Sequence, residues 1–460
     1  MSYNIMNNIT DNLHFNRRYR LCRCLRIPTK GALARPTGNQ YLPVRKFVSS
    51  GANFRVPSST RAKSADFARQ AHAFMREPRD ISKSVWRKTL SYAIMESFQP
   101  ERMIPVTESP CTDGGRYVPY AERYGNESIV YFTRDLSAEG LRKIYARVCG
   151  EITGKVAVKL HTGEQYGPNI IPREWVKALI DNELRGATII ETNTFYEGDR
   201  DTTEKHLKTL EINGWTFCPV DITDADGTAD LPVNGKWFDH MSVGKTLPTY
   251  DSMVALTHFK GHTMGGFGGS NKNIGIGCAD GKIGKCMIHA RSSQDPELAW
   301  SVDMEELMER MCESTKATID FFGKRVCYVN VMRNISVSCD CEGCLAEPVV
   351  TPDIGILAST DILAVDQACV DLIYALSEAD GAAMRERIES RHGHRQLSYM
   401  QELHMGNRKY LLMDIDRADE RIRPADAVEG VVPFVELPET AERRMRALAA
   451  AAAAEAAKQE

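Results

Sequence analysis

An apolar stretch, Met253-Val254-Ala255-Leu256, runs into Thr257-His258-Phe259-Lys260-Gly261-His262 and then into Gly265-Gly266-Phe267-Gly268-Gly269-Ser270-Asn271-Lys272-Asn273. The first four residues predict a buried strand, and the strand leads directly into a loop that holds two histidines and two lysines. Glycine at this density lets backbone N–H groups approach a ligand closely and form concavities that bind anions. We therefore expect the functional site at the end of this strand.

Strands and helices alternate on both sides of this stretch. The hydrophobic pattern predicts further strands at 129–132, 155–160, 187–191, 217–222, 325–331 and 354–357. It predicts helices at 139–148, 172–185, 203–213, 304–322 and 362–376, with Ser137 as an N-cap and Gly214 as a terminator. This alternation predicts an α/β fold with a mostly parallel sheet, helices on both faces and Rossmann-like layers.

Polar side chains follow most of the predicted strands. In parallel sheets ligands bind beyond the carboxyl ends of the strands. The residues at these ends include His161, Glu164, Asn193, Asp221, His258, Lys260, His262, Asn334, Ser359, Asp361 and Asp366. We expect one shared cleft, formed by His161, Glu164, Asn193, His258, Lys260, His262 and the glycine loop.

The histidines of this loop suggest a metal ligand or a proton-transfer group. His258 and His262 are four residues apart, which would place both imidazoles on one face of a helix, but Gly261 and the glycines after it make a helix unfavourable. Either ring could instead donate to a backbone carbonyl. If His161 joins them from its own strand end, three imidazoles could hold zinc, nickel or iron.

The glycine loop together with Lys260 and Lys272 predicts an anion site for a phosphate or a carboxylate. The residues expected to contact the ligand or cofactor are Gly265, Gly266, Gly268, Gly269, Asn271, Lys272 and Asn193. Because the loop is neither a Walker A sequence nor a GxGxxG fingerprint at a first strand turn, nucleotide binding is not indicated. The alternative is that Gly275 and Gly277 only allow a strand and a helix to pack closely.

A second cluster, Cys339-Asp340-Cys341-Glu342-Gly343-Cys344, places three thiols within six residues. Such thiols can ligate one metal ion or one edge of an iron-sulfur cluster. A fourth ligand would come from Cys278, Cys286, Cys327 or a histidine. The alternatives are reduced thiols in a polar loop and a structural zinc clip. Thirteen cysteines at irregular spacing argue against a disulfide framework.

Two aspartates follow the last predicted strand. Asp361 stands at the start of the predicted helix 362–376, where a carboxylate is stabilised by the helix dipole. Asp366 is a candidate general base facing the cleft.

Charge is distributed unevenly along the 460 residues. Residues 1–65 hold twelve lysines and arginines and one acid, Asp11, which leaves 46 basic and 60 acidic residues in the remainder. An acidic body makes nucleic acid an unfavourable partner, and no apolar run reaches the length of a membrane span. The basic amino terminus has the composition of an organellar transit peptide, or it is a disordered extension. We expect a cytoplasmic protein, or one of an organellar matrix if the terminus is a transit peptide.

The expected organisation has three parts. Residues 1–127 form an irregular basic extension and linker, with one predicted helix at 81–96 and a turn-rich stretch at 100–126. Residues 128–420 form the α/β core. Residues 421–460 form an alanine-rich helical tail.

Five motifs, taken in order, resemble the bacterial and archaeal family catalogued as domain of unknown function 362, often labelled iron-sulfur-centre proteins. The resemblance covers about residues 128–415. The motifs are Lys159-Leu160-His161-Thr162-Gly163-Glu164, Thr192-Asn193-Thr194, Thr257 to His262 with its glycine loop, Ser338-Cys339-Asp340-Cys341, and Pro352-Asp353-Ile354-Gly355-Ile356-Leu357-Ala358-Ser359.

One departure from the family is important. Many members carry a ferredoxin-like pair of CxxCxxCxxxC motifs soon after the glycine loop, whereas the only cysteine between Ala290 and Lys324 here is Cys312. The electron-transfer label of the family therefore does not carry over on that ground. Any cluster would have to use Cys339, Cys341 and Cys344.

The sequence thus predicts a metal-dependent or iron-sulfur-dependent enzyme, an oxidoreductase, that acts on a small anionic molecule and is served by a redox partner protein. In this hypothesis His258, His262, His161 and Glu164 act as ligands or proton-transfer groups, and Lys260 and Lys272 hold the anion. The metal ligands are Cys339, Cys341, Cys344 and Cys278. The alternative is a non-catalytic protein that binds a metal or a small ligand at a structural cysteine site.

Overall fold

The structure, a computed structural model, describes residues 127–436 apart from 292–297, the positions 112, 113, 116 and 117, and scattered positions between 438 and 453. The predicted helix at 81–96 and the basic extension lie outside the described residues. Within the expected linker, the described positions form a pair of two-residue strands, β1 (Thr112–Asp113) and β2 (Arg116–Tyr117).

Nine strands form one sheet. They are β3 (Ser128–Thr133), β4 (Val156–Lys159), β5 (Thr188–Glu191), β6 (Val220–Ile222), β9 (Ser252–His258), β12 (Val326–Met332), β13 (Gly355–Ser359), β14 (Tyr410–Asp414) and β15 (Glu420–Ile422). Their order across the sheet is β15-β14-β3-β13-β12-β9-β4-β5-β6. The pairings are parallel except those made by β13 and β15. The prediction of a mostly parallel sheet is confirmed.

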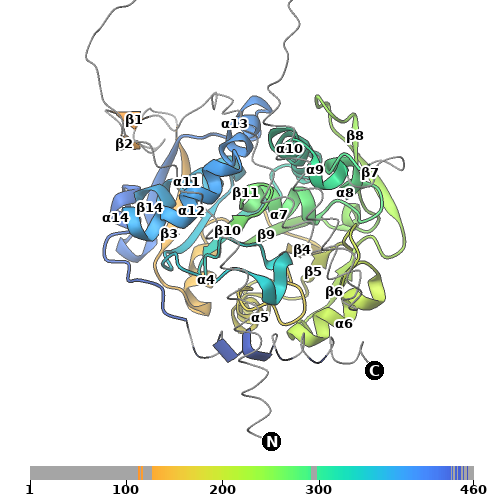
Figure 1. The fold of residues 1–460 in the computed structure, drawn as a ribbon, viewed down its shortest axis with the longest axis horizontal. Helices are drawn as coiled ribbons and strands as arrows, with labels where there is room; N and C mark the ends of the chain where they lie inside the picture. Colours follow the sequence, from red (N-terminus) through yellow and green to blue (C-terminus); the bar gives the residue numbers. More distant parts are fainter. Residues whose placement is uncertain are drawn as a thin grey trace, which may run out of the picture. The chain divides into compact units, whose positions relative to one another are not determined.

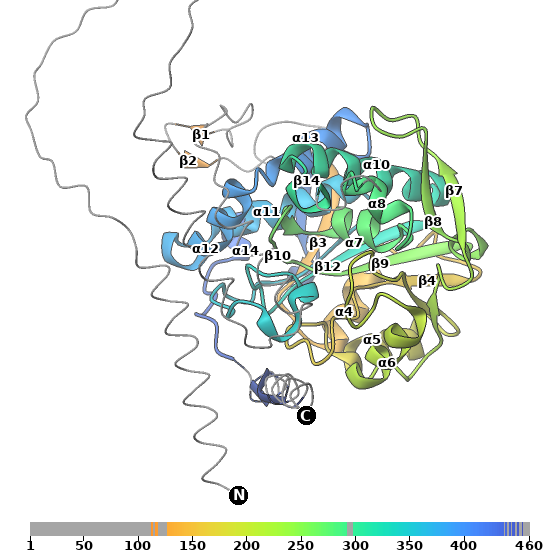
Figure 2. The same ribbon diagram turned by 45° about the vertical axis from the view of Figure 1, so that its right-hand side comes forward.

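Helices cover both faces of this sheet, and each face has its own hydrophobic core (Figures 1 and 2). One face packs against α7 (Ser270–Gly277), α10 (Met304–Phe322) and α11 (Ile362–Ala375), and the other against α4 (Ala138–Tyr145), α5 (Arg173–Asn182) and α6 (Thr203–Asn213). Side chains alternate along β9: Met253 and Ala255 enter the first core, and Val254 and Leu256 the second. A strand buried on both faces is therefore apolar throughout, as the sequence indicated.

Local capping sets several helix ends at the predicted residues, whereas α4 and α5 each end three residues before the predicted end. The side chain of Ser137 accepts from the Gly140 backbone N–H at the start of α4. Helix α6 ends at Gly214, whose φ of 80° lies in the left-handed region that favours glycine. Helix α10 begins at Asp303, which accepts from two backbone N–H groups of the first turn, and its bounds agree with the prediction.

The remaining elements are short or lie at the periphery. They are β7 (Thr228–Pro232), β8 (His240–Gly244), η2 (Leu247–Thr249), β10 (Lys260–His262), β11 (Gly266–Gly268), α8 (Gly284–Ile288), α9 (Leu298–Ser301), η3 (Asp340–Leu345), α12 (Glu378–Ser390), α13 (His394–Glu402), η4 (Ile415–Arg417) and α14 (Pro424–Ala427). Among the described residues, no helix combines the length and the apolar character that crossing a membrane requires.

The direction of β13 corrects one expectation. This strand runs antiparallel to both neighbours, so that Ser359 pairs with Tyr328 near the start of β12. Ser359 and Asp361 therefore lie at the edge opposite His258. Asp361 caps α11 by accepting from the Ala364 N–H, which confirms the structural role expected for it. Hydrophobic periodicity reveals a strand but not its direction, which is why the sequence misplaced this end.

The glycine-rich stretch also differs from the loop that was predicted. After β9 the chain forms a hairpin of β10 and β11, and it then enters α7 at Ser270. Neither His258 nor His262 lies on a helix, as expected from the glycines. Glycine at position 261 is required by contact, because a Cβ there would lie 2.3 Å from the Val337 carbonyl oxygen.

Replacing Gly261 by Ala should therefore destabilise the protein by roughly 2 kcal/mol, because the backbone of Val337 must move to accept a methyl group. Urea unfolding followed by circular dichroism measures this loss. Gly150→Ala is the matched control, since a Cβ at position 150 meets nothing within 4 Å. Equal stability of the two variants would contradict the packing described here.

Candidate functional site

The buried carboxylate of Asp340 holds the segment 339–344, called here the cysteine segment, at the edge of the sheet. Asp340 Oδ2 lies 2.9 Å from His258 Nδ1, at the end of β9, and 2.9 Å from Lys260 Nζ, at the start of β10. All three side chains are buried. Burial opposes ionisation, but His258 and Lys260 outweigh it and hold the pKa of Asp340 well below its usual range.

His258 has no lone pair to offer a metal in this arrangement. Its Nδ1 faces the Asp340 carboxylate, and its Nε2 lies 2.7 Å from the Arg333 carbonyl oxygen. Because both neighbours are acceptors, the ring donates from both nitrogens. His258 therefore positions Asp340 and the loop after β12.

Cys339 lies buried at the centre of a group of donors. Lys272 Nζ, from the first turn of α7, is 3.3 Å from its sulfur. The Cys341 thiol is the largest cause of a pKa well below the usual cysteine value; burial opposes it, and Lys272, His161 and His262 lower it further. For Lys272, burial is likewise outweighed, chiefly by the Cys339 thiolate, and its pKa is raised. The site therefore holds a thiolate paired with an ammonium.

The two imidazoles beside Cys339 present a proton to it. Nδ1 of His161 accepts from the Gly163 N–H at 2.9 Å, and Nδ1 of His262 accepts from the Gly265 N–H at 2.9 Å. Burial lowers the pKa of both rings, so each is neutral. A neutral ring that accepts at Nδ1 carries its proton on Nε2. These protons point to the Cys339 thiolate.

One group of side chains in the described part of the chain could hold a metal ion. Ligand atoms of His262, Cys339 and Cys341 lie within 4.8 Å of one another. The two thiolates suit a soft ion such as zinc or iron. A metal-bound histidine normally donates its second N–H, whereas Nδ1 of His262 accepts, so this ring fits only after its Nε2 proton is lost or moved.

The other two predicted metal ligands lie outside this group. Cys344 is on the same short helix, η3, but is not among the three close ligands. Cys278 follows α7, and burial raises its pKa to about 12. Cys278 is not among the three close ligands either.

The predicted anion site is occupied by the carboxylate of Asp366, a residue of the same chain. The backbone N–H groups of Ser270 and Asn271, at the start of α7, donate to Asp366 at 2.8 Å and 2.9 Å. Gly269 is required here, because a Cβ would lie 2.4 Å from Asp366 Oδ1. Asp366 also accepts from Asn330, and burial raises its pKa to about 6. Asp366 thus caps α7.

The other predicted ligand contacts have partners within the protein. Asn271 donates to Cys312 and to Gln396. Asn193 donates to Thr203, and its carbonyl oxygen lies 3.4 Å from His206 Nδ1. The glycines at 265, 266 and 268 line the β10–β11 hairpin, where Gly265 and Gly268 bring the backbone close to His262, Lys260 and Lys272.

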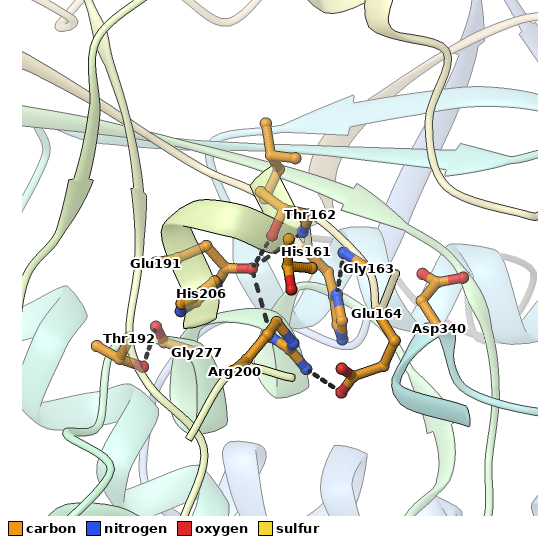
Figure 3. Close-up of polar contacts among 12 residues, drawn as sticks. His161, Thr162, Gly163, Glu164, Glu191, Thr192, Arg200, His206, Gly277 and Asp340 are labelled. Atoms are coloured by element: carbon orange, nitrogen blue, oxygen red, sulfur yellow. Dashed lines mark hydrogen bonds and ion pairs between the residues drawn. The ribbon is translucent and has the colours of Figure 1, made fainter. Parts of the chain in front are cut away.

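A buried network of charges lies beside His161 (Figure 3). Glu191 accepts from Lys159 at 2.7 Å and from both the N–H and the hydroxyl of Thr162. Glu164, predicted as catalytic, accepts from Arg200 at 3.0 Å. The Glu164 backbone N–H also reaches the Asp340 carbonyl at 3.4 Å. The network therefore joins the ends of β4 and β5 to the cysteine segment.

Sequence reasoning missed three residues of this site. In the sequence Asp340 is only a spacer between cysteines, and no motif gives Lys159 or Arg200 a role. A lysine that ends an otherwise apolar strand is the one signal that could have identified Lys159. Arg200 belongs to none of the motifs, and only the folded chain brings it to Glu164.

Lys272→Met should raise the pKa of Cys339, because the variant keeps the length of the side chain but removes the charge that stabilises the thiolate. Ultraviolet absorbance of the thiolate, followed against pH, should show its midpoint shifted to higher pH by roughly one unit or more. Lys282→Met, on an exposed lysine after α7, is the control. An unchanged midpoint would show that Lys272 does not neutralise Cys339.

Known proteins show limited similarity to this chain. No curated protein matches it. The lactate racemase apoprotein from Thermoanaerobacterium thermosaccharolyticum is 16% identical with a TM-score of 0.27, over 46% of this chain and 54% of that one. A crystal structure of a Thermotoga maritima protein is 11% identical with a TM-score of 0.30, over 42% and 49%. The alignments thus span about half of each known structure, and they carry no inference about function.

A protein-family model matches the central region. It is described as Domain of unknown function (DUF362), and it covers residues 156–371. This range begins with β4 and ends within α11, and it contains Cys339, Lys272 and all three predicted histidines of the site. The resemblance that the sequence motifs indicate is therefore confirmed, and residues 156–371 of this chain match the DUF362 family.

Proposed function

We propose that this protein is a metal-dependent enzyme of redox chemistry, with a single soft transition-metal ion held by Cys339, Cys341 and His262. The observation that carries the proposal is that ligand atoms of these three side chains lie within 4.8 Å of one another. Two come from the segment after β12 and one from β10, so the fold itself brings them together. Thiolates and imidazole are the ligands that zinc, iron and nickel share.

The residues around the three ligands would balance the charge of the ligands and hold them in position. Lys272 would offset the negative charge of the two thiolates, and His161 would donate from Nε2 to Cys339. Asp340 would hold the cysteine segment against β9 and β10. Bound at this position, such an ion would transfer electrons or polarise a polar group of the substrate.

A single ion is favoured over an iron-sulfur cluster. Clusters of the common types need four cysteine thiolates. Among the described residues, only the thiols of Cys339 and Cys341 belong to the close group of ligands, and Cys278 does not. The substrate we propose is a small anion, because a bound cation and Lys272 together favour negative charge. If the purified protein binds metal but turns over no substrate, it is instead a carrier of the ion.

Cys339→Ser and Cys341→Ser should each lower the bound metal from a single ion per chain to a small fraction, because a hydroxyl is a far weaker ligand for a soft ion. Metal analysis of protein purified without oxygen measures this. Cys149→Ser, on the opposite face of the sheet next to Ala146, is the matched control and should retain the ion. Equal metal content in all three variants would rule out the proposed centre.

A second candidate function is thiolate chemistry without a metal, with Cys339 as the nucleophile. The tautomers of His161 and His262 favour it, because both rings direct N–H groups at the sulfur. Donors of this kind stabilise a thiolate and would protonate a leaving group.

His262→Ala separates the two candidates. If His262 is a ligand, the variant should bind zinc at least about tenfold more weakly, because losing even a residue that only orients a ligand costs about tenfold or more. If His262 only donates to Cys339, zinc affinity should stay unchanged and alkylation of Cys339 by iodoacetamide should require higher pH. The exposed His240, replaced by Ala, is the control for both measurements.

A further inference from the structure

A cluster of aromatic rings lies beside the proposed centre. Phe195 stacks on Trp300 with ring centroids 5.2 Å apart, and Phe195 lies 4.6 Å from the imidazole of His289. Tyr196 meets Phe195 edge to face at 5.5 Å. The segment 195–196 follows β5 at the carboxyl edge of the sheet, which is where ligands bind in such folds.

The cluster adjoins the residues of the site on two sides. Tyr196 donates from its hydroxyl to Glu164 at 3.3 Å. On the other side, burial is the main cause that lowers the pKa of His289 to about 3, and His262 and Lys272 are close enough to lower it further. The rings therefore contact the Glu164 network directly, through Tyr196, and lie against His289 on the other side.

These rings are not explained by core packing alone. Phe195 and Tyr196 belong to neither of the two hydrophobic cores among the described residues. Phe195, Tyr196 and Trp300 all keep part of their surface exposed. Partly exposed aromatic rings next to a polar centre are a usual feature of small-molecule sites.

The charges around the rings select the kind of molecule. Aromatic faces by themselves attract cations. Here, however, the guanidinium of Arg291 already lies 5.9 Å from the centroid of Phe195. A cationic ligand would meet this guanidinium, whereas an anion would be attracted by it.

We propose that Phe195 and Trp300 form the subsite for the substrate of the proposed enzyme, and that this substrate is a planar aromatic carboxylate. Its ring stacks against these two side chains. Its carboxylate pairs with the guanidinium of Arg291, which lies over the Phe195 ring. Calling this molecule a substrate rests on the proposed function, whereas its binding does not depend on the metal.

Binding of benzoate to the full chain tests the subsite, with cyclohexanecarboxylate as a probe of equal charge and a puckered ring. Isothermal titration should give benzoate the smaller Kd by about fivefold to tenfold, the range expected of an aromatic pair. Phe195→Leu and Trp300→Leu should each remove most of this preference. Phe321→Leu, on a partly buried ring near the end of α10, should leave it unchanged.

The outcomes separate this proposal from the previous one. Equal Kd values for the two acids, or a benzoate preference that survives both substitutions, would overturn the subsite. Tighter binding of benzylamine than of benzoate would overturn the assignment of charge. A benzoate preference in a protein that binds no metal would uphold the subsite while the metal-dependent function fails.

Discussion

The pairing of Asp340 with His258 and Lys260 is the interaction on which the site depends. Asp340 belongs to the segment after β12, and its two partners come from the end of β9 and the start of β10. Removing one partner of a buried ion pair leaves an uncompensated charge and costs about 3–5 kcal/mol. This pairing therefore holds the cysteine segment at one place over the sheet edge.

The pairing of Asp340 also restricts the positions of its neighbours in the sequence. Cys339 and Cys341 flank it, so fixing the aspartate also fixes the two sulfurs on either side. Lys272 then reaches Cys339 from α7, whose first turn is itself held by Asp366. Three elements far apart in the sequence thus converge through two carboxylates that have no chemical role of their own.

The sequence predicted the elements better than it predicted the contacts. Helices such as α6 and α10 begin at capping side chains and carry a clear apolar period, so their bounds could be read directly. The antiparallel direction of β13 could not, because periodicity is the same in both directions. The cap formed by Asp366 was also hidden, because a helix N-terminus binds a carboxylate as readily as a substrate anion.

In the candidate site, too, the sequence predicted the residues better than their contacts. Histidines, lysines and cysteines at strand ends indicated where chemistry could occur, and the structure brings His161, His262, Lys272, Cys339 and Cys341 together. Their pairing was not predictable, since the lysines expected to hold a ligand anion instead face Asp340 and Cys339. Which anion a lysine meets depends on tertiary distances that no single motif contains.

The placement of protons in this site links metal binding to the thiolate. Backbone N–H groups at Nδ1 of both imidazoles leave the ring protons on Nε2, directed at Cys339. A metal at His262 has to displace one such proton, and it also has to remove the proton of Cys341, whose pKa is raised beside the Cys339 thiolate. Metal uptake in this pocket is therefore coupled to proton release, and it becomes more favourable as pH rises. The same donors stabilise the thiolate before any metal arrives, so the protein does not need the ion in order to keep Cys339 charged.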